Sequence, residues 1–306
     1  MNLATNLVTL SDVEAAAARI EGLAVRTPLL AFGDNLWLKP ENLQPIGAFK
    51  IRGAANAVSS MSPSAVVTHS SGNHGRALAF AASRLGIPVT VVMPSTSPKV
   101  KIDAIRVLGA TIEIVEPADR LTAALRVASE TGATLIPPFD HPAVIAGQGT
   151  IGLEIVVEKP SVEVVYVPIG GGGLISGVGA AVKALSPSTR VIGVEPLLAA
   201  ETAESLRAGR LITWPTERTY QTVADGVRTA PSELTFAHIQ KFVDDIVTVT
   251  EEEILAAMRT LALEARLVAE PSGALSVAAA LREGGRGVAI ISGGNVDPSL
   301  LQSCLA

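Results

Sequence analysis

The chain has 306 residues, which is enough for one large core or two modest domains. Hydrophobic residues make up 48%, aromatic residues 3% and charged residues 17%, a globular composition that excludes a disordered or fibrous protein. The net charge of −5 comes from charges of both signs spread along the chain, so we expect no nucleic-acid partner. The only cysteine, Cys304, has no partner for a disulfide or a metal site.

The N-terminal segment does not resemble a secretion signal, because no basic stretch precedes an apolar one. Instead, "SDVEAAAARI" predicts a helix with Ser11 as its N-cap and Glu14 three residues later. Residues 164–182 carry no charge and have nearly the length of a membrane span. They contain four consecutive glycines, however, which favour a strand, a turn and a helix. We therefore expect a cytoplasmic protein with no membrane partner.

Two segments repeat one pattern of strand, glycine turn, helix and strand. They are residues 65–94 and residues 162–196. Each predicts one βαβ unit, so we expect an α/β protein with parallel sheets flanked by helices. Parallel sheets bind ligands at the carboxyl ends of their strands. The turns at residues 70–75 and 170–173 are therefore the first candidates for a binding site.

The glycine run at residues 170–173 predicts an anion site. It follows a predicted strand and precedes a predicted helix, whose first N–H groups are free to bind a phosphate. No Gly-Lys-Ser/Thr follows, which excludes a Walker A loop. Glu195 ends the next predicted strand, about where a dinucleotide site has its ribose-binding acid. The run alone therefore leaves two alternatives, a phosphate-bearing cofactor and a nicotinamide dinucleotide.

Lys50, in "GAFKIRGAAN", is a candidate reactive amine. A lysine in a partly desolvated site has a lowered pKa and can form a Schiff base with an aldehyde. The turn "SSGNHG" adds the short polar side chains of Ser71 and Asn73, while His74 is interpreted as a locally bonded helix-start residue. A lysine, a phosphate site and a polar glycine turn match the aldehyde, phosphate, ring hydroxyl and pyridine nitrogen of pyridoxal phosphate.

Seven motifs in order carry a family resemblance: "KPENLQPIGAFKIRGA", "SSGNHG", "VIAGQGTIGLEI", "PIGGGGLISG", "VADGVRT", "EPSGA" and "SGGNVD". Together they resemble the serine/threonine dehydratase and serine racemase family, the fold-type-II pyridoxal phosphate enzymes, including threonine ammonia-lyases and threo-3-hydroxyaspartate dehydratases. The resemblance implies a two-domain α/β architecture like that of the tryptophan synthase β chain, with the cofactor between the domains. We expect residues 1–51 and 142–306 to form the large cofactor-binding domain and residues 52–141 the small inserted domain.

The resemblance also implies the contacts of the cofactor and the substrate. Lys50 and Ser71 would be catalytic, on opposite faces of the substrate's Cα. The other cofactor-binding residues would be Phe49 beside the ring, Asn73 at the ring hydroxyl, Gly170, Gly171, Gly172, Gly173 and Leu174 at the phosphate, Gly226 on the far side and Ser292 at the pyridine nitrogen. The loop of Ser70, Ser71, Gly72, Asn73 and His74 would hold the substrate's carboxylate.

The implied reaction removes water and ammonia from threonine, serine or 3-hydroxyaspartate and gives a 2-oxo acid. A neutral serine at the pyridine nitrogen cannot force its protonation, which favours loss of a β-hydroxyl once the Cα proton has gone. Ser71 leaves open a serine or aspartate racemase with side dehydratase activity, because racemisation requires a second acid/base group. A NAD-dependent oxidoreductase and a non-catalytic amino-acid sensor are the alternatives from other classes.

A cation site is implied after the "GVEP" strand. Glu195, Glu201 and the carbonyl of Ala199 occupy the matching places, and oxygen ligands suit Mg²⁺, Ca²⁺ or Mn²⁺. Glu201 stands where this family usually has aspartate. We also expect that the protein is a homodimer and that it binds a small amino-acid substrate.

Overall fold

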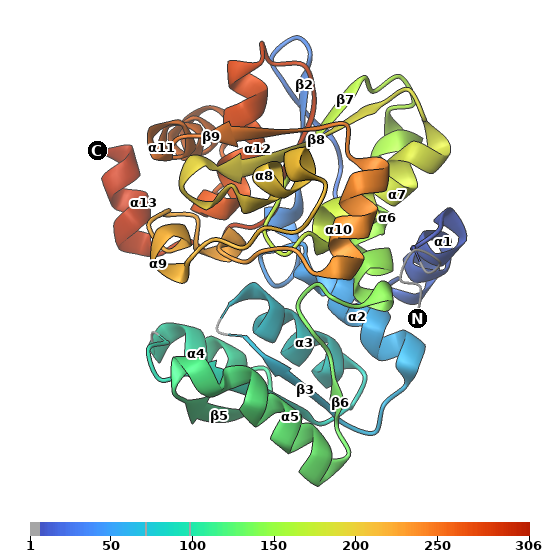
Figure 1. Ribbon diagram of the computed structural model, residues 1–306, viewed down its shortest axis with the longest axis vertical. Helices are drawn as coiled ribbons and strands as arrows, with labels where there is room; N and C mark the ends of the chain where they lie inside the picture. The colour runs from blue at the N-terminus through green and yellow to red at the C-terminus, as the bar shows by residue number, and fades with distance from the viewer. Residues whose placement is uncertain (1–6, 71, 98) are drawn as a thin grey trace.

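The computed structural model describes residues 7–70, 72–97 and 99–306, and the strands of these residues form two sheets (Figure 1). The six-stranded sheet has the order β1-β2-β10-β7-β8-β9. Its strands are β1 (Leu30–Phe32), β2 (Leu36–Pro40), β7 (Val164–Pro168), β8 (Arg190–Pro196), β9 (Asp245–Val249) and β10 (Gly287–Ile291). β1 is antiparallel to β2, and all other neighbours are parallel. The expected parallel α/β sheet is confirmed.

The four-stranded sheet is wholly parallel and has the order β5-β4-β3-β6. Its strands are β3 (Val66–His69), β4 (Val89–Pro94), β5 (Thr111–Val115) and β6 (Thr134–Leu135). Val66, Val91 and Met93 face α2 and α3, whereas Val67 and Val92 face α5. This alternation is the period of two that a sheet covered on both faces requires.

The helices account for most of the remaining residues. They are α1 (Leu10–Arg19), α2 (Lys50–Met61), α3 (Asn73–Arg84), α4 (Lys99–Arg106), α5 (Arg120–Thr131), α6 (Pro142–Glu158), α7 (Gly173–Leu185), α8 (Glu201–Ala208), α9 (Thr216–Thr219), α10 (Glu233–Phe242), α11 (Glu251–Thr260), α12 (Pro271–Arg282) and α13 (Pro298–Leu305). Short 3₁₀ or π turns lie at Glu41–Leu43, Pro117–Asp119, Leu197–Ala199, Asp225–Val227 and Leu261–Ala265.

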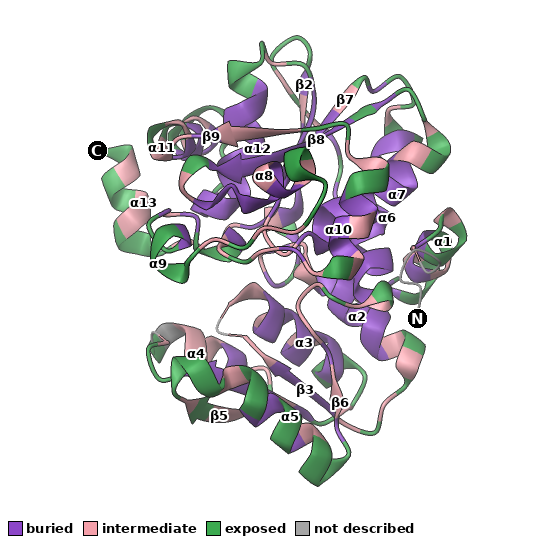
Figure 2. Ribbon diagram, in the orientation of Figure 1, coloured by how far each residue is buried: buried purple, intermediate pink, exposed green. Residues whose placement is uncertain are grey.

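The six-stranded sheet is covered on both faces. Tyr166 packs in the cluster that contains α11 and α12, whereas its neighbours Val165 and Val167 pack with α6 and α7. Figure 2 shows α7 and α12 coloured almost entirely as buried, as expected for helices that lie against a central sheet. The core of the larger sheet is therefore two apolar layers, one on each face.

The uncharged segment at residues 164–182 folds as β7, a glycine turn and α7, which confirms the strand–turn–helix interpretation. Gly177 in α7 lies against α6, since a Cβ added to it would meet the carbonyl oxygen of Ile145 at 2.1 Å and the nitrogen of Gly149 at 2.5 Å. Gly177 thus allows the close packing of α6 and α7. In the part of the chain that the structure describes, no helix is long and apolar enough to cross a membrane.

Two expectations from the sequence concern the first helix and the domain boundary. The first helix begins at Leu10, and its N-cap is Thr9 instead of Ser11, because Thr9 and Asp12 form a reciprocal capping box. The expected domain boundary between residues 51 and 52 falls inside α2, which packs against both α3 and α6. The division into two domains stays a prediction.

Candidate active site

Both predicted glycine turns lie at the carboxyl end of a parallel strand and lead directly into a helix. Ser70 follows β3, and Gly72 is the N-cap of α3. Gly172 is the N-cap of α7 and has a φ of 83°, in the left-handed region that favours glycine. Each helix therefore presents its unpaired N–H groups, and the positive end of its dipole, at the end of a sheet.

Lys50 is the first residue of α2, and its amine is held in a desolvated place. Its Nζ donates to the carbonyl oxygen of Pro138 over 2.7 Å and lies 5.1 Å from the centre of the Phe49 ring. Burial disfavours the ammonium form and lowers the pKa of Lys50 to about 8. A substantial fraction of this amine is therefore neutral, and so nucleophilic, at mildly alkaline pH.

The glycine run lies next to the segment that binds Lys50. A Cβ added to Gly171 would lie 2.3 Å from the Phe139 ring, and one added to Gly173 would lie 2.8 Å from the Cβ of Phe139. Because Pro138 and Phe139 are consecutive, the lysine amine and the glycine run meet on one short stretch of chain. The run is thus a tight backbone cradle that a side chain at Gly171 or Gly173 would fill. Leu174, which follows it in α7, is buried.

Gly226 and Ser292 come together at Ser272, near the start of α12. The N–H of Gly226 donates to the Ser272 hydroxyl over 2.9 Å, and the Ser292 hydroxyl donates to the Ser272 carbonyl over 3.2 Å. Ser292 is only 5% exposed and directly follows β10. A Cβ added to Gly170 would meet the Cα of Val227 at 2.8 Å, so the 225–227 turn also lies against the glycine run.

Asn73 is the first residue of α3, and its side chain contacts two residues that lie beside the six-stranded sheet. Its Nδ2 donates to Oε1 of Glu270 over 2.6 Å, and its Oδ1 accepts from Nδ2 of Asn295 over 2.7 Å. Glu270 is buried, and desolvation together with the charge of Asp225 raises its pKa to about 7. Both the nitrogen and the oxygen of the Asn73 amide therefore have hydrogen-bond partners.

His74 is neutral and does not contribute a charge to the site. The ring is 3% exposed, its Nε2 lies 3.0 Å from the carbonyl oxygen of Ile136, and burial lowers its pKa to about 3. The ring has a hydrogen-bond partner, but Ile136 lies 62 positions away in sequence, so the expectation of a locally bonded ring is wrong. Any contact between His74 and a substrate would use its backbone N–H at the start of α3.

A cluster of buried charges fixes the start of α2. Arg52 donates to both carboxylate oxygens of Glu41, over 2.7 and 2.8 Å, and to both of Glu154, over 2.6 and 2.9 Å. Lys39 donates to Glu154 over 2.6 Å and balances the second carboxylate. Arg52 and Glu41 are 1% or less exposed. This network ties the helix that begins with Lys50 to β2, to the turn after it and to α6.

The residues of the expected cation site lie close in sequence and are buried. The oxygens of Glu195 accept from the backbone nitrogens of Thr202 and Ala203, over 3.0 and 2.8 Å, and burial raises its pKa to about 7. Oε2 of Glu201 is buried, and no residue that the structure describes forms a hydrogen bond to it. Ala199 ends the turn between them. An unpartnered buried carboxylate oxygen beside a second carboxylate fits a hard cation with oxygen ligands.

The residues present also fit pyridoxal phosphate. The desolvated amine of Lys50 suits an aldehyde, the cradle at Gly170–Gly173 with the first turn of α7 suits a phosphate, and the buried hydroxyl of Ser292 suits a ring nitrogen. Ser71 lies outside the described residues.

The sequence analysis missed four residues of this site. Glu270, Ser272 and Asn295 belong to the motifs "EPSGA" and "SGGNVD", which were used only for the resemblance and could have directed attention to them. Phe139 gave no signal, because an isolated phenylalanine after two prolines shows no periodicity.

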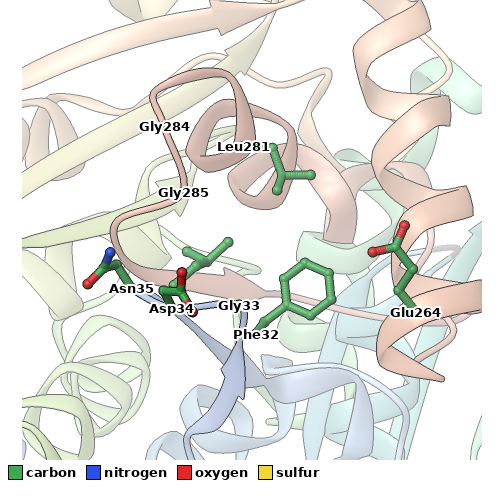
Figure 3. Close-up of a pocket in the computed structure, with 9 residues that line it drawn as sticks. Phe32, Gly33, Asp34, Asn35, Glu264, Leu281, Gly284 and Gly285 are labelled. Atoms are coloured by element: carbon green, nitrogen blue, oxygen red, sulfur yellow. The ribbon is translucent and has the colours of Figure 1, made fainter.

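One cavity of about 350 Å³ lies elsewhere, beside the turn between β1 and β2 (Figure 3). Its lining includes Phe32, Asp34 and Glu264 and contains none of the expected site residues. Its described lining contains no lysine and no histidine, and we assign it no function.

The comparisons with known proteins identify the family of the chain. The family model for pyridoxal-phosphate dependent enzymes matches residues 20–293. The chain belongs to this family. Three curated relatives are similar over nearly the whole chain. The L-threonine ammonia-lyase of Thermotoga maritima is 44% identical, over 96% of this chain and 77% of the relative. Human serine racemase is 42% identical, over 95% and 92%. The L-threo-3-hydroxyaspartate ammonia-lyase of Saccharomyces cerevisiae is 41% identical, over 94% of each.

The fold has a close counterpart among solved structures. The structure of maize serine racemase has a TM-score of 0.91 and is 37% identical, and the match covers 97% of each chain. The expected family and the expected fold class are therefore confirmed, and the chain is an enzyme of the pyridoxal phosphate type. A dinucleotide oxidoreductase no longer accounts for the glycine run.

Proposed function

We propose that the protein is a lyase that removes water and ammonia from a small β-hydroxy amino acid, with pyridoxal phosphate as its cofactor. Threonine, serine and 3-hydroxyaspartate are the candidate substrates, since these are the amino acids in the names of the similar enzymes. The observation that carries the proposal is the desolvated Lys50 amine, which meets the glycine run at Pro138 and Phe139.

Lys50 is proposed to hold the cofactor and to act as the base. When bound, pyridoxal phosphate draws electron density away from the substrate's Cα. The substrate's amino group replaces Lys50 on the aldehyde, which frees the lysine amine. The neutral amine would then take the Cα proton, the electron pair of that bond would form a Cα–Cβ double bond, and the Cβ–O bond would break. The β-hydroxyl would leave as water with a proton from the Lys50 ammonium or from solvent. The released enamine hydrolyses to a 2-oxo acid and ammonia.

The start of α3 is proposed to hold the substrate's carboxylate. Gly72, Asn73 and His74 lie at the N-terminus of a 12-residue helix, where free N–H groups and the helix dipole favour an anion. This orients the Cα–H bond without placing a second cation near Lys50. Burial is what lowers the pKa of the Lys50 amine.

A racemase is the second candidate, and it depends on Ser71. If Ser71 faces the side of Cα opposite Lys50, it supplies the second acid/base group that racemisation requires. The similarity to human serine racemase favours this activity beside elimination. In the Ser71→Ala variant we expect racemisation to be lost and elimination of one enantiomer to be kept. Unchanged rates of both reactions would leave Ser71 without a catalytic role.

We further propose a cation at Glu195, Glu201 and the carbonyl of Ala199, a homodimer, a cytoplasmic location and the two-domain division at residues 52–141. The cation proposal is supported by the unpartnered Oε2 of Glu201. Sedimentation of the purified protein tests the dimer, and limited proteolysis with fragment mapping tests the division.

The deciding experiment measures 2-oxo acid formation from both enantiomers of serine, threonine and 3-hydroxyaspartate. The wild-type protein should be yellow and turn over at least one of them. Lys50→Ala should lose both the colour and the activity, whereas Lys99→Ala is the control, because the Lys99 side chain is 86% exposed. A colourless wild-type protein that turns over none of these substrates after incubation with the cofactor would leave the amino-acid sensor as the better interpretation.

A further inference from the structure

Four side chains form a continuous chain of hydrogen bonds that reaches Asn73. Arg76 donates from NH1 to Oδ1 of Asn295 over 2.8 Å. Asn295 donates from Nδ2 to Oδ1 of Asn73 over 2.7 Å, and Asn73 donates from Nδ2 to Glu270 over 2.6 Å. Every donor points in the same direction, from the guanidinium to the carboxylate, so the bonds polarise one another.

The ends of this chain determine which way both amides face. A guanidinium only donates, so Asn295 must turn its oxygen toward Arg76. The two hydrogens on Nδ2 of Asn295 then go to Asn73 and, over 2.9 Å, to the carbonyl oxygen of Ile46, which only accepts. Asn73 is therefore the acceptor at Oδ1, and its nitrogen must face Glu270.

One donor is left over. The Nδ2 group of Asn73 carries two hydrogens, and Glu270 receives one of them. None of the described residues accepts the other hydrogen, which is available to a ligand. A bare asparagine side chain could rotate by 180° and present its oxygen instead, but in this arrangement that rotation would break the bonds to Asn295 and Glu270 together.

We propose that Arg76 and Asn295 are positioning residues that orient Asn73, so that it offers an N–H group to the ring oxygen of the cofactor. The inference rests on the proposed contact between Asn73 and pyridoxal phosphate. Arg76 acts at a distance through two amides and touches no reacting atom.

The same chain of bonds joins separate parts of the fold. Arg76 and Asn73 lie one turn apart on α3, beside the four-stranded sheet. Glu270 precedes α12, and Asn295 follows β10 of the six-stranded sheet. A merely structural role for these bonds would affect stability, whereas the proposed role also affects cofactor affinity through Asn73. Affinity and stability must therefore be measured separately.

The test uses Asn295→Asp, Asn73→Ala and their combination. The carboxylate of the Asn295→Asp variant can still accept from Arg76 but cannot donate to Asn73. We expect this variant to bind pyridoxal phosphate about 3- to 10-fold more weakly, the effect of one hydrogen bond. Adding Asn295→Asp to Asn73→Ala should weaken binding no further, because Asn295 acts through Asn73. Affinity is measured by titrating the apoenzyme with the cofactor and following absorbance.

Two further variants separate orientation from folding. Arg76→Leu should weaken cofactor affinity in the same direction, and Arg76→Lys, which keeps a donor, should restore most of it. Arg84→Leu, on the same helix but exposed, should bind the cofactor like the wild type. The thermal midpoint of each apoenzyme variant is measured in parallel.

The outcomes distinguish the orienting role of Asn295 from the cofactor contact of Asn73. If Asn73→Ala weakens binding while Asn295→Asp binds like the wild type, the orienting role is wrong and the contact of Asn73 stands. Additive losses in the combined variant also overturn the orienting role. If Asn73→Ala itself binds the cofactor normally, the proposed contact fails and the inference falls with it.

Discussion

The backbone N–H of Phe49 donates to the backbone carbonyl of Ser292 over 3.0 Å. Lys50 follows Phe49 directly, so the amine and the proposed partner of the pyridine nitrogen start from backbones joined by one hydrogen bond. Ala48 and Gly293 form a β-bridge beside it. The main chain, and not side-chain rotamers alone, therefore sets the distance between the two groups.

The pKa of Lys50, about 8, predicts how fast the apoenzyme takes up its cofactor. Only the neutral amine attacks an aldehyde, and burial lowers the pKa, so the neutral fraction rises with pH up to about 8 and then levels off. We expect the rate constant of reconstitution to rise about tenfold per pH unit below that value and to be flat above it. Stopped-flow absorbance measures it. A rate that still climbs between pH 9 and 10 would contradict the lowered pKa.

Gly171→Ala should weaken cofactor binding. The added Cβ would lie 2.3 Å from the Phe139 ring, so either the ring or the glycine run must move. Such overpacking costs about 1–3 kcal/mol. If this strain falls on the cofactor site, affinity drops roughly 10- to 100-fold.

The partner of that contact provides the control. Combining Gly171→Ala with Phe139→Ala removes the ring that the new Cβ meets, so affinity should recover toward that of Phe139→Ala alone. A combined variant that binds as weakly as the product of the two single effects would show that Phe139 is not the cause.

Arg52→Met should destabilise the fold strongly. It removes the guanidinium that donates to Glu41 and Glu154 and leaves the fully buried Glu41 without its main counter-charge. Breaking a buried ion pair from one side costs about 3–5 kcal/mol. Urea unfolding measures the loss. Arg84→Met, which removes an exposed arginine from α3, should change the free energy of unfolding by less than about 0.5 kcal/mol.

The conservative change at the same position separates charge from geometry. Arg52→Lys keeps the positive charge but loses the planar fork that bonds two carboxylates at once. We expect Arg52→Lys to be more stable than Arg52→Met but to lose most of the paired hydrogen bonds that the guanidinium makes at the start of α2. A variant as stable as the wild type would mean that a point charge is sufficient there.

Mg²⁺ should stabilise the protein through Glu201. A cation that binds only the native state adds about 2.7 kcal/mol at one hundred times its Kd. We expect the thermal midpoint of chelator-treated protein to rise when Mg²⁺ is added back, and Glu201→Gln to abolish the rise. Glu217→Gln, at an exposed position, is the matched control. An equal rise in the Glu201→Gln variant would move the cation elsewhere.

The sequence predicted the main features of the fold because they depend on local chemistry. The glycine turns after β3 and β7 and the two βαβ units follow from apolar periodicity and from glycine placement, which neighbours in sequence determine. The predicted N-cap of the first helix was wrong by two residues. The sequence "LSDVE" predicts a capping box of Ser11 and Glu14, but the structure has the capping box of Thr9 and Asp12. Which of the two forms depends on which hydroxyl faces the end of the helix.

The rest of the site could not be predicted because it depends on long-range contacts. Lys50 bonds to a backbone carbonyl 88 positions away, and Asn73 to Glu270, 197 positions away. A carbonyl has no sequence signature, and the buried state of Glu270 exists only after the two sheets pack together. Arg52 lies two residues after Lys50, and only its partners Glu41 and Glu154 show that it secures the start of the helix.

The pairing of β2 with β10 sets the order in which this enzyme is completed. The register joins Leu38 to Ala289 and Pro40 to Ile291, so the middle of the larger sheet is vacant until the ribosome has made residues 287–291. Lys50 leaves the ribosome long before Ser292, which lies far later in the sequence. A growing chain therefore carries its reactive amine long before the place that would activate it exists, and premature chemistry with free aldehydes is limited to that of an ordinary lysine.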